Sequence, residues 1–265
     1  MRLLHELLRE YSTDEKQYKE YIQSLKNSVL TAFYTPEAVA SVIQRTLQAS
    51  GVVPGRFLDP SAGTGVFISP LKDVPEITCF EKDKLTGRIL SALYPDSKVI
   101  IDGFQTIQPY YNGYFDVVSS NIPFGDTKVY DRDFDRRGDP VRKGALNAVH
   151  NYFFLKGMDT LREGGIMAFI TTSGVMDSPG NRPIREWLVN HAGLVSAVRL
   201  PGNLFTDAGT KVSSDLIVLQ KNSRKNGLTE TERNFNRDPH TARKHHHQQQ
   251  LQGTGPHYPY RCQDR

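Results

Sequence analysis

From residue 56 onward, short apolar runs alternate with amphipathic stretches, and this alternation constrains the fold more than any other feature. The apolar runs are 56–58, 77–80, 98–101, 115–119, 165–171, 194–200 and 215–220. Helical periodicity lies between several of them, at 85–93, 145–161 and 184–191. Continuous apolar strands alternating with helices are typical of a mostly parallel sheet covered on both faces. We therefore predict an α/β domain with a doubly wound, mostly parallel sheet of seven strands.

The chain before this domain is predicted to be helical. Apolar side chains recur at helical spacing over 3–11 and 14–29, and Thr35-Pro36 opens a further helix that closes at Gly51. We assign residues 1–50 to an N-terminal helical segment and residues 51–223 to the main domain.

Residues 224–265 differ from the rest in composition. Only 7 of these 42 residues are hydrophobic, and the segment carries the whole formal charge of +4, so residues 1–223 are neutral overall. Such a composition buries too little apolar surface to offset the entropy of ordering the chain. We predict a disordered tail, with a truncated or out-of-frame terminus from about residue 234 as an alternative interpretation.

Several classes of protein are disfavoured by what the sequence contains. The two cysteines, Cys79 and Cys262, form no disulfide framework and have no metal-ligand spacing, so no metal is expected. The start of the chain is charged, and no apolar run reaches the length of a membrane span. We expect a cytoplasmic protein that does not enter a membrane.

In a doubly wound sheet, ligands bind beyond the carboxyl ends of the strands, so the residues there are the candidates for a site. Asp59 ends the first strand and is followed by Gly63 and Gly65, which allow a tight turn and close approach of a ligand. The third glycine of a dinucleotide-binding turn and the Gly-Lys-Ser/Thr of a phosphate loop are missing. The acidic residue favours a ligand with a cationic group.

The next two strand ends also carry carboxylates. Glu81 follows the second strand, about 20 residues beyond the glycines, where a carboxylate accepts hydrogen bonds from ribose hydroxyls. Asp102 follows the third, placed to accept from an adenine amino group, with Phe104 as a candidate cover for the ring.

The fourth strand ends in Asn121, Ile122, Pro123 and Phe124. The Asn121 side-chain oxygen and the Ile122 carbonyl offer two acceptors to a planar amino group, and Phe124 offers a stacking face. This tetrad is the most distinctive of the motifs.

Taken in this order, the motifs resemble those of class I S-adenosylmethionine-dependent methyltransferases, in the group that includes adenine-specific DNA methyltransferases. The likeness covers roughly residues 31–221 and is greatest to the methylase portion of methylase–helicase polypeptides of mobile elements. It implies the Rossmann-like methyltransferase fold and S-adenosylmethionine as cofactor. The implied cofactor-binding residues are Phe33, Thr35, Asp59, Gly63, Gly65, Glu81, Asp102 and Phe104.

The resemblance also implies roles at the catalytic end. Asn121 and the Ile122 carbonyl accept the protons of the target amine, Phe124 stacks on the base, and Phe205 offers a second aromatic ring. The family tetrad has proline where this chain has Ile122, which keeps the carbonyl but removes rigidity from the turn.

The function expected is methyl transfer to the adenine amino group in DNA, as in restriction-modification. The chain after 220 is too short for a folded target-recognition domain, so such a domain, a helicase or another subunit is an expected partner alongside DNA. Two alternatives stay open: methylation of a protein glutamine amide, and a non-catalytic module that binds the cofactor or DNA within a larger helicase-type protein.

Overall fold

The sheet of the computed structural model forms where the sequence alternates. The structure describes residues 9–22, 35–71, 73–136, 138–202 and 213–237. Its strands are β1 (Arg56–Asp59), β2 (Glu76–Phe80), β3 (Lys98–Ile100), β4 (Phe115–Asn121), β5 (Leu161–Thr172), β6 (Ala192–Arg199) and β7 (Ser214–Lys221). Each predicted apolar run coincides with one of these strands, which confirms the seven-stranded α/β fold.

The order of the strands places a switch point at the centre of the sheet. The order is β3-β2-β1-β4-β5-β7-β6, with β7 antiparallel to both of its neighbours and the other pairs parallel. From β1 the chain continues outward to β2 and β3, then returns to β4 on the other side of β1. Ligands of open α/β sheets bind at such a reversal, so the ends of β1 and β4 mark the candidate site.

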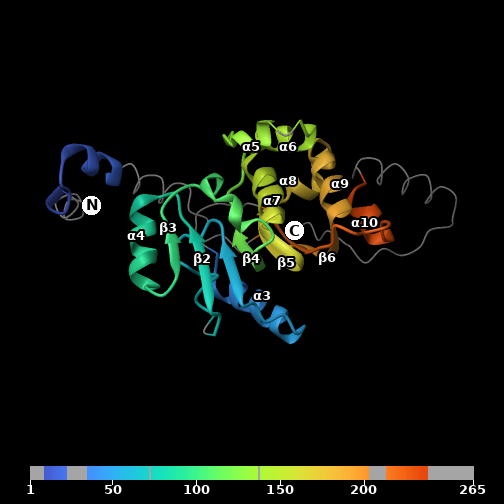
Figure 1. Cartoon of the computed structure of the whole chain (residues 1–265), viewed down its shortest axis with the longest axis horizontal. Coiled ribbons are helices and arrows are strands. Elements are labelled where there is room, and N and C mark those ends of the chain that lie inside the picture. The colour runs from blue at the N-terminus through green and yellow to red at the C-terminus, as the bar shows by residue number, and fades with distance from the viewer. Residues whose placement is uncertain (1–8, 23–34, 72, 137, 203–212, 238–265) are drawn as a thin grey trace.

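Helices cover both faces of the sheet (Figure 1). They are α3 (Glu37–Ala49), α4 (Lys84–Leu93), α5 (Arg132–Arg136), α6 (Pro140–Ala145), α7 (Val149–Thr160), α8 (Gly174–Asp177), α9 (Arg182–His191) and α10 (Glu230–Phe235). Short 3₁₀ turns lie at Phe104–Thr106, Pro109–Tyr111 and Pro179–Asn181. None of the helices in the described ranges is long and apolar enough to span a bilayer.

The pleat of the strands separates two hydrophobic clusters. In β5, Met167 and Phe169 belong to the cluster that contains α7 and α9, whereas Ala168 and Ile170 belong to the cluster that contains α3. Successive side chains of a strand point to opposite faces, so a continuous apolar run is buried on both sides. This is why the strands read as unbroken apolar segments.

The helix predicted over 145–161 is interrupted in the structure. Helix α6 ends at Ala145 and α7 begins at Val149, and a turn is closed by hydrogen bonds from the Asn147 and Ala148 amides to the carbonyls of Gly144 and Ala145. Leu161 already belongs to β5. Every residue of α7 but Asp159 is buried, so its burial is less one-sided than that of an amphipathic surface helix.

The prediction of a disordered tail from residue 224 is wrong for its first part, and 238–265 lies outside the described residues. Helix α10 begins with a capping box in which Thr229 and Glu232 satisfy each other's backbone amides. Glu232 is buried, accepts the Leu194 amide of β6 at 2.9 Å and pairs with Lys225. These polar contacts, with Phe235 packed on the core, order residues 224–237 despite their low apolar content.

A buried polar cluster fixes the segment between β4 and α7. Asp131 accepts hydrogen bonds from the Tyr152 hydroxyl at 2.7 Å and from Lys156 Nζ at 3.0 Å, both on α7. Although burial opposes ionisation, these two donors hold the pKa of Asp131 below its ordinary value. The segment that carries α5 and α6, at the top of the view in Figure 1, is therefore attached to the core.

We expect Asp131→Ala to lower the free energy of unfolding by about 3 kcal/mol, because it leaves the Lys156 ammonium buried without its partner. The exposed Asp133 on the same segment provides the matched control, and Asp133→Ala is expected to change stability by less than about 0.5 kcal/mol. Denaturant unfolding of both variants measures the difference. Equal stabilities would contradict the role of Asp131 as an anchor.

Candidate functional site

The end of β1 places a buried carboxylate at the switch point. Asp59 is fully buried, and its Oδ1 accepts hydrogen bonds from the Ser61 amide at 3.1 Å and the Ser120 hydroxyl at 2.7 Å. Its Oδ2 has no hydrogen-bond partner among the described residues. Burial raises the pKa of Asp59 to about 7, against the lowering effect of the two hydrogen bonds. A cationic donor that reached Oδ2 would favour the ionised form.

The two glycines after β1 are needed for the backbone of the turn. Gly63 has φ 55° and Gly65 has φ 93°, a region that side chains disfavour. A Cβ at Gly65 would lie 2.3 Å from the Tyr94 ring, whereas a Cβ at Gly63 would meet nothing within 4 Å. Gly65 is therefore required for packing against α4, and Gly63 leaves open space beside the turn.

Glu81 connects the glycine turn to the end of β2. Its Oε2 accepts the Gly63 amide at 2.8 Å and its Oε1 accepts the Asp83 amide at 2.7 Å. Burial raises the pKa of Glu81, and the amide hydrogen bonds act in the opposite direction. The sequence predicts a carboxylate here. In the structure both of its oxygens accept backbone amides, one from the glycine turn at Gly63 and one from Asp83 just after β2.

At the end of β3 the two candidate residues separate. Asp102 is exposed and accepts the Gly103 amide at 2.7 Å, so its carboxylate lies at the surface of the strand end. Phe104 is only 2% exposed and packs against Phe80 and Phe153. The ring of Phe104 thus packs in the core, and its role as a cover for a ligand ring stays a prediction.

The tetrad follows directly from the end of β4. Asn121 is its last residue and is partly buried, while Pro123 and Phe124 are partly exposed. Ile122 is 1% exposed, and its amide donates to the Ile170 carbonyl of β5 at 3.1 Å. Proline has no amide hydrogen and cannot make this bond. Sheet pairing and burial thus hold the backbone at Ile122, and the effect of isoleucine in place of proline on the turn stays a prediction.

Ser120 is a site residue that the sequence analysis missed. Its hydroxyl is buried and joins β4 to β1 through Asp59. A serine in an apolar strand, directly before Asn121, is the signal that would have pointed to it. Thr35 lies just before α3 and is buried, while Phe33 and Phe205 lie outside the described residues.

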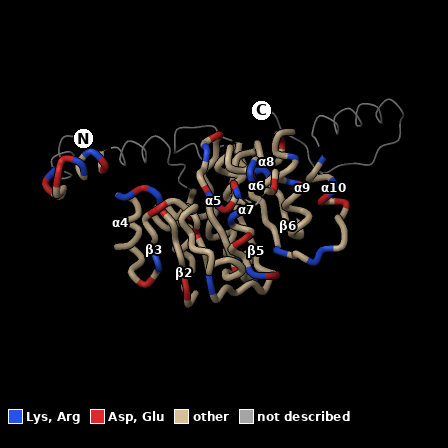
Figure 2. The backbone as a smooth tube through the Cα atoms, turned by 45° about the horizontal axis from the view of Figure 1, so that its top comes forward, with Lys and Arg blue, Asp and Glu red and all other residues tan. Residues whose placement is uncertain are grey.

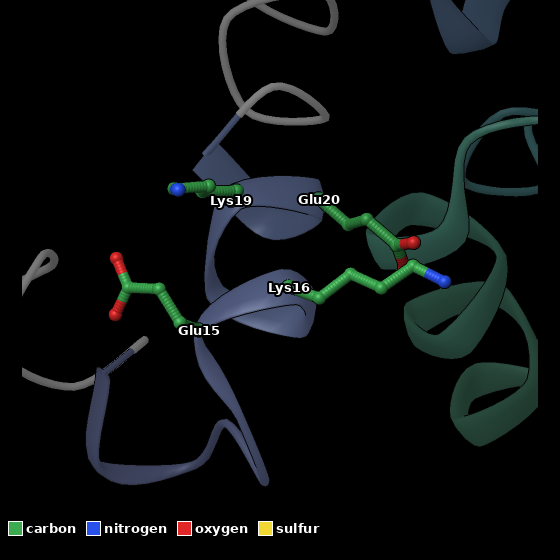
Figure 3. Close-up of a pocket in the computed structure, with 4 residues that line it drawn as sticks. All are labelled: Glu15, Lys16, Lys19 and Glu20. Carbon is green, nitrogen blue, oxygen red and sulfur yellow. The ribbon is translucent and has the colours of Figure 1, made fainter.

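Elsewhere in the described part of the chain, one group of charged residues lies on the solvated surface. Figure 3 shows a surface pocket lined by Glu15, Lys16, Lys19 and Glu20, where the Glu20 side chain extends toward α4. There Glu20 forms an ion pair with Lys84 at 2.6 Å. Exposed ion pairs of this kind are typical of a solvated surface. In the described ranges, no cluster of His, Cys, Asp and Glu has an arrangement that holds a metal ion.

The strand ends therefore combine a buried carboxylate, a glycine turn, a second carboxylate and an amide-bearing tetrad at one switch point. Comparison with known families gives a match over residues 94–254 to the family described as N-6 DNA Methylase, and this range includes the tetrad and more than half of the chain. The chain belongs to the N-6 DNA methylase family.

Two relatives are similar to this family member in sequence. Defense against restriction protein B of Escherichia phage P1 is 29% identical over 196 residues, which are 72% of this chain and 8% of the phage protein. Modification methylase CviBIII of Paramecium bursaria Chlorella virus NC1A is 25% identical over 212 residues, 78% of this chain and 55% of the viral protein. The chain thus spans only part of the length of both relatives.

Solved structures of restriction-enzyme proteins share the fold. The M protein of the type I restriction enzyme EcoKI has a TM-score of 0.56 at 16% identity, over 84% of this chain and 54% of that chain. The type IIG restriction endonuclease BpuSI has a TM-score of 0.60 at 17% identity, over 79% of this chain and 28% of that chain. At such identities the likeness is one of fold.

Proposed function

We propose that this chain transfers the methyl group of S-adenosylmethionine to the exocyclic amino group of adenine in DNA. The observation that carries the proposal is the Asn121–Phe124 tetrad at the end of β4, next to the buried Asp59 at the end of β1, in a member of the N-6 DNA methylase family. Residues 51–223 form the catalytic unit in this proposal, and α3, in the helical segment before them, packs on the sheet.

The residues at the switch point fit the proposed cofactor. The buried Oδ2 of Asp59, without a partner among the described residues, suits the ammonium of its methionine part. The open space at Gly63 allows close approach to the turn, and Glu81 and Asp102 supply carboxylates for ribose hydroxyls and the adenine amino group. Thr35 and Phe33 complete the proposed set. S-adenosylmethionine supplies an electrophilic methyl group on a sulfonium.

The protein's own part in the reaction is to make an aryl amine nucleophilic. The lone pair of such an amine is delocalised into the ring, and two acceptors on its protons pull the nitrogen toward a tetrahedral geometry. Asn121 Oδ1 and the Ile122 carbonyl are these acceptors. In oriented intramolecular reactions, alignment of the reacting groups lowers the activation barrier by about 7–11 kcal/mol. Most of the rate can therefore come from positioning, and the reaction needs no strong base.

DNA as the substrate requires the base to leave the duplex. Flipping costs on the order of a few kcal/mol, and stacking of the base on Phe124, and on Phe205, offsets part of this cost. In Figure 2 basic and acidic positions are interspersed along the described chain. Because the body is neutral, we propose that a partner domain or subunit, such as a target-recognition domain or a helicase, supplies further phosphate contacts and sequence specificity.

The pKa of Asp59 predicts a pH dependence of cofactor binding. With a pKa raised to about 7 by burial, Asp59 is mostly neutral below that pH and cannot attract an ammonium. We expect the dissociation constant for S-adenosylmethionine to rise about tenfold for each pH unit below about 7. Titration calorimetry from about pH 5.5 to about pH 8.5 measures it.

Asp59→Asn provides the control for this titration. Its binding is expected to be weak and less dependent on pH, because the amide cannot ionise and Glu81, whose pKa burial also raises, is the titrating carboxylate that remains. A pH-independent dissociation constant in the unsubstituted protein would contradict the proposed contact with Asp59.

The proposal is tested by methyl transfer from S-adenosylmethionine to duplex DNA of mixed sequence. Appearance of N6-methyladenine supports it. If the chain binds the cofactor but methylates a protein glutamine and not DNA, its substrate is a protein. If it does not bind S-adenosylmethionine at all, the proposed cofactor is wrong.

A further inference from the structure

We propose that His150, at the start of α7, is a positioning residue. It holds the tetrad loop, residues 121–125, in place through the backbone of Gly125. This inference rests on the proposed function, because the loop it positions carries Asn121 and Phe124. The observation is a hydrogen bond of 3.4 Å from the Gly125 amide to Nδ1 of His150.

The loop needs an external support at Gly125. The tetrad leaves the sheet after Ile122, whose amide makes the last bond to β5. Gly125 has φ 123°, a conformation open to glycine and strained for other residues. Without a partner for its amide, this residue would be free to adopt the many other conformations that glycine allows. The bond to His150 selects one of them directly after Phe124.

His150 is placed for this task and for little else. It is 5% exposed, and its second ring nitrogen, Nε2, has no hydrogen-bond partner in the described part of the chain. A buried polar atom without a partner destabilises a fold, so packing alone does not account for a histidine here. Among the residues that the structure describes, the one hydrogen bond of the ring joins it to the tetrad loop.

Helix α7 supports the loop at two points. His150 holds Gly125, and Tyr152 and Lys156, further along the same helix, hold Asp131. The segment from 125 to 131 is thus fixed at both of its ends to one rigid helix. We infer that α7 aligns the tetrad with the core, and that His150 is the contact nearest the reacting groups.

The bond requires a neutral ring with its proton on Nε2, since a protonated Nδ1 cannot accept. Burial lowers the pKa of His150, and two smaller effects, from the nearby carboxylate of Asp126 and from the Gly125 backbone, oppose it only in part. Further along α7, Lys156 pairs with Asp131 and Asp159 pairs with Arg142. The environment therefore maintains the acceptor form of the ring near neutral pH.

Two substitutions separate positioning from packing. His150→Leu removes the acceptor, and we expect kcat for methyl transfer to fall about 100-fold, as is typical of a small misalignment of reacting groups, while the dissociation constant for S-adenosylmethionine changes less than about twofold. His150→Asn places an amide oxygen near the position of Nδ1, and we expect it to retain kcat within about fivefold of the unsubstituted protein. His191→Leu, at the end of α9, is the matched histidine control and leaves kcat unchanged.

A second readout does not depend on activity. Amide hydrogen exchange at Gly125 is expected to accelerate at least about tenfold in His150→Leu and to stay near the original rate in His150→Asn. Equal kcat in His150→Leu and the unsubstituted protein, or equal losses in both variants, overturns the positioning role.

The exchange measurement also separates the two ways in which the account can fail. If the unsubstituted protein transfers no methyl group, the proposed function fails. The exchange rates at Gly125 then decide the role of His150 by themselves: acceleration in His150→Leu alone supports it, and unchanged or equally raised rates in both variants overturn it.

Discussion

Replacing Asn121 by alanine is expected to lower the rate of methyl transfer by about 1,000-fold or more, while the affinity for S-adenosylmethionine stays within about twofold. Asn121 ends β4 and is the proposed side-chain acceptor for the target amine, so its loss would remove an interaction needed only in the transition state. The carboxylates proposed to bind the cofactor lie at the ends of β1, β2 and β3 and are left in place. Single-turnover transfer and calorimetric titration measure the two quantities separately.

The exposed Asn112 provides the matched control for this experiment. Asn112→Ala removes the same amide from a turn before β4 and is expected to leave both quantities unchanged. An equal loss of methyl transfer and of cofactor binding in Asn121→Ala would show that Asn121 belongs to the cofactor site. Full activity of this variant would show that the tetrad does not take part in the reaction.

The second large effect is expected at Glu81, where alanine should weaken the binding of S-adenosylmethionine about 100-fold. The carboxylate is proposed to accept charge-assisted hydrogen bonds from the ribose and also accepts the Gly63 amide, so its loss would remove a ligand contact and release the glycine turn. Glu81→Gln keeps acceptor capacity without the charge, and we expect a loss of about tenfold. Titration calorimetry with the whole chain measures these affinities.

Glu76 allows a matched control on the same strand. It lies at the opposite end of β2, where it accepts a hydrogen bond from the Tyr114 hydroxyl. Glu76→Ala is expected to leave cofactor affinity unchanged. Equal weakening in both variants would indicate an effect on the sheet as a whole instead of a contact at its carboxyl edge.

Much of the fold is readable from the sequence because strands buried on both faces leave a local signal. Each apolar run from 56–58 to 215–220 became a strand, and their carboxyl ends carry Asp59, Glu81 and Asp102, as the pattern predicts. The spacing of Thr229 and Glu232 is a local signal for the start of helix α10. The low apolar content of residues 224–265 nevertheless led to the prediction of a disordered tail.

Other features depend on contacts distant in sequence and were not predictable from local pattern. The burial of Phe104 is set by its contact with Phe153 on α7, and the rigidity at Ile122 by its bond to Ile170. The attachment of Asp131 to Lys156 likewise joins residues 25 positions apart. Such contacts follow from the strand order, which a single sequence does not specify.

The most direct test of the central claim uses the whole chain, S-adenosylmethionine with a labelled methyl group, and duplex DNA of mixed sequence. After digestion of the DNA to nucleosides, we expect the label in N6-methyladenine. This label is expected to be absent with the Asn121→Ala variant and present with the Asn112→Ala variant. Label on cytosine or on protein, or cofactor binding without any label in DNA, would contradict it.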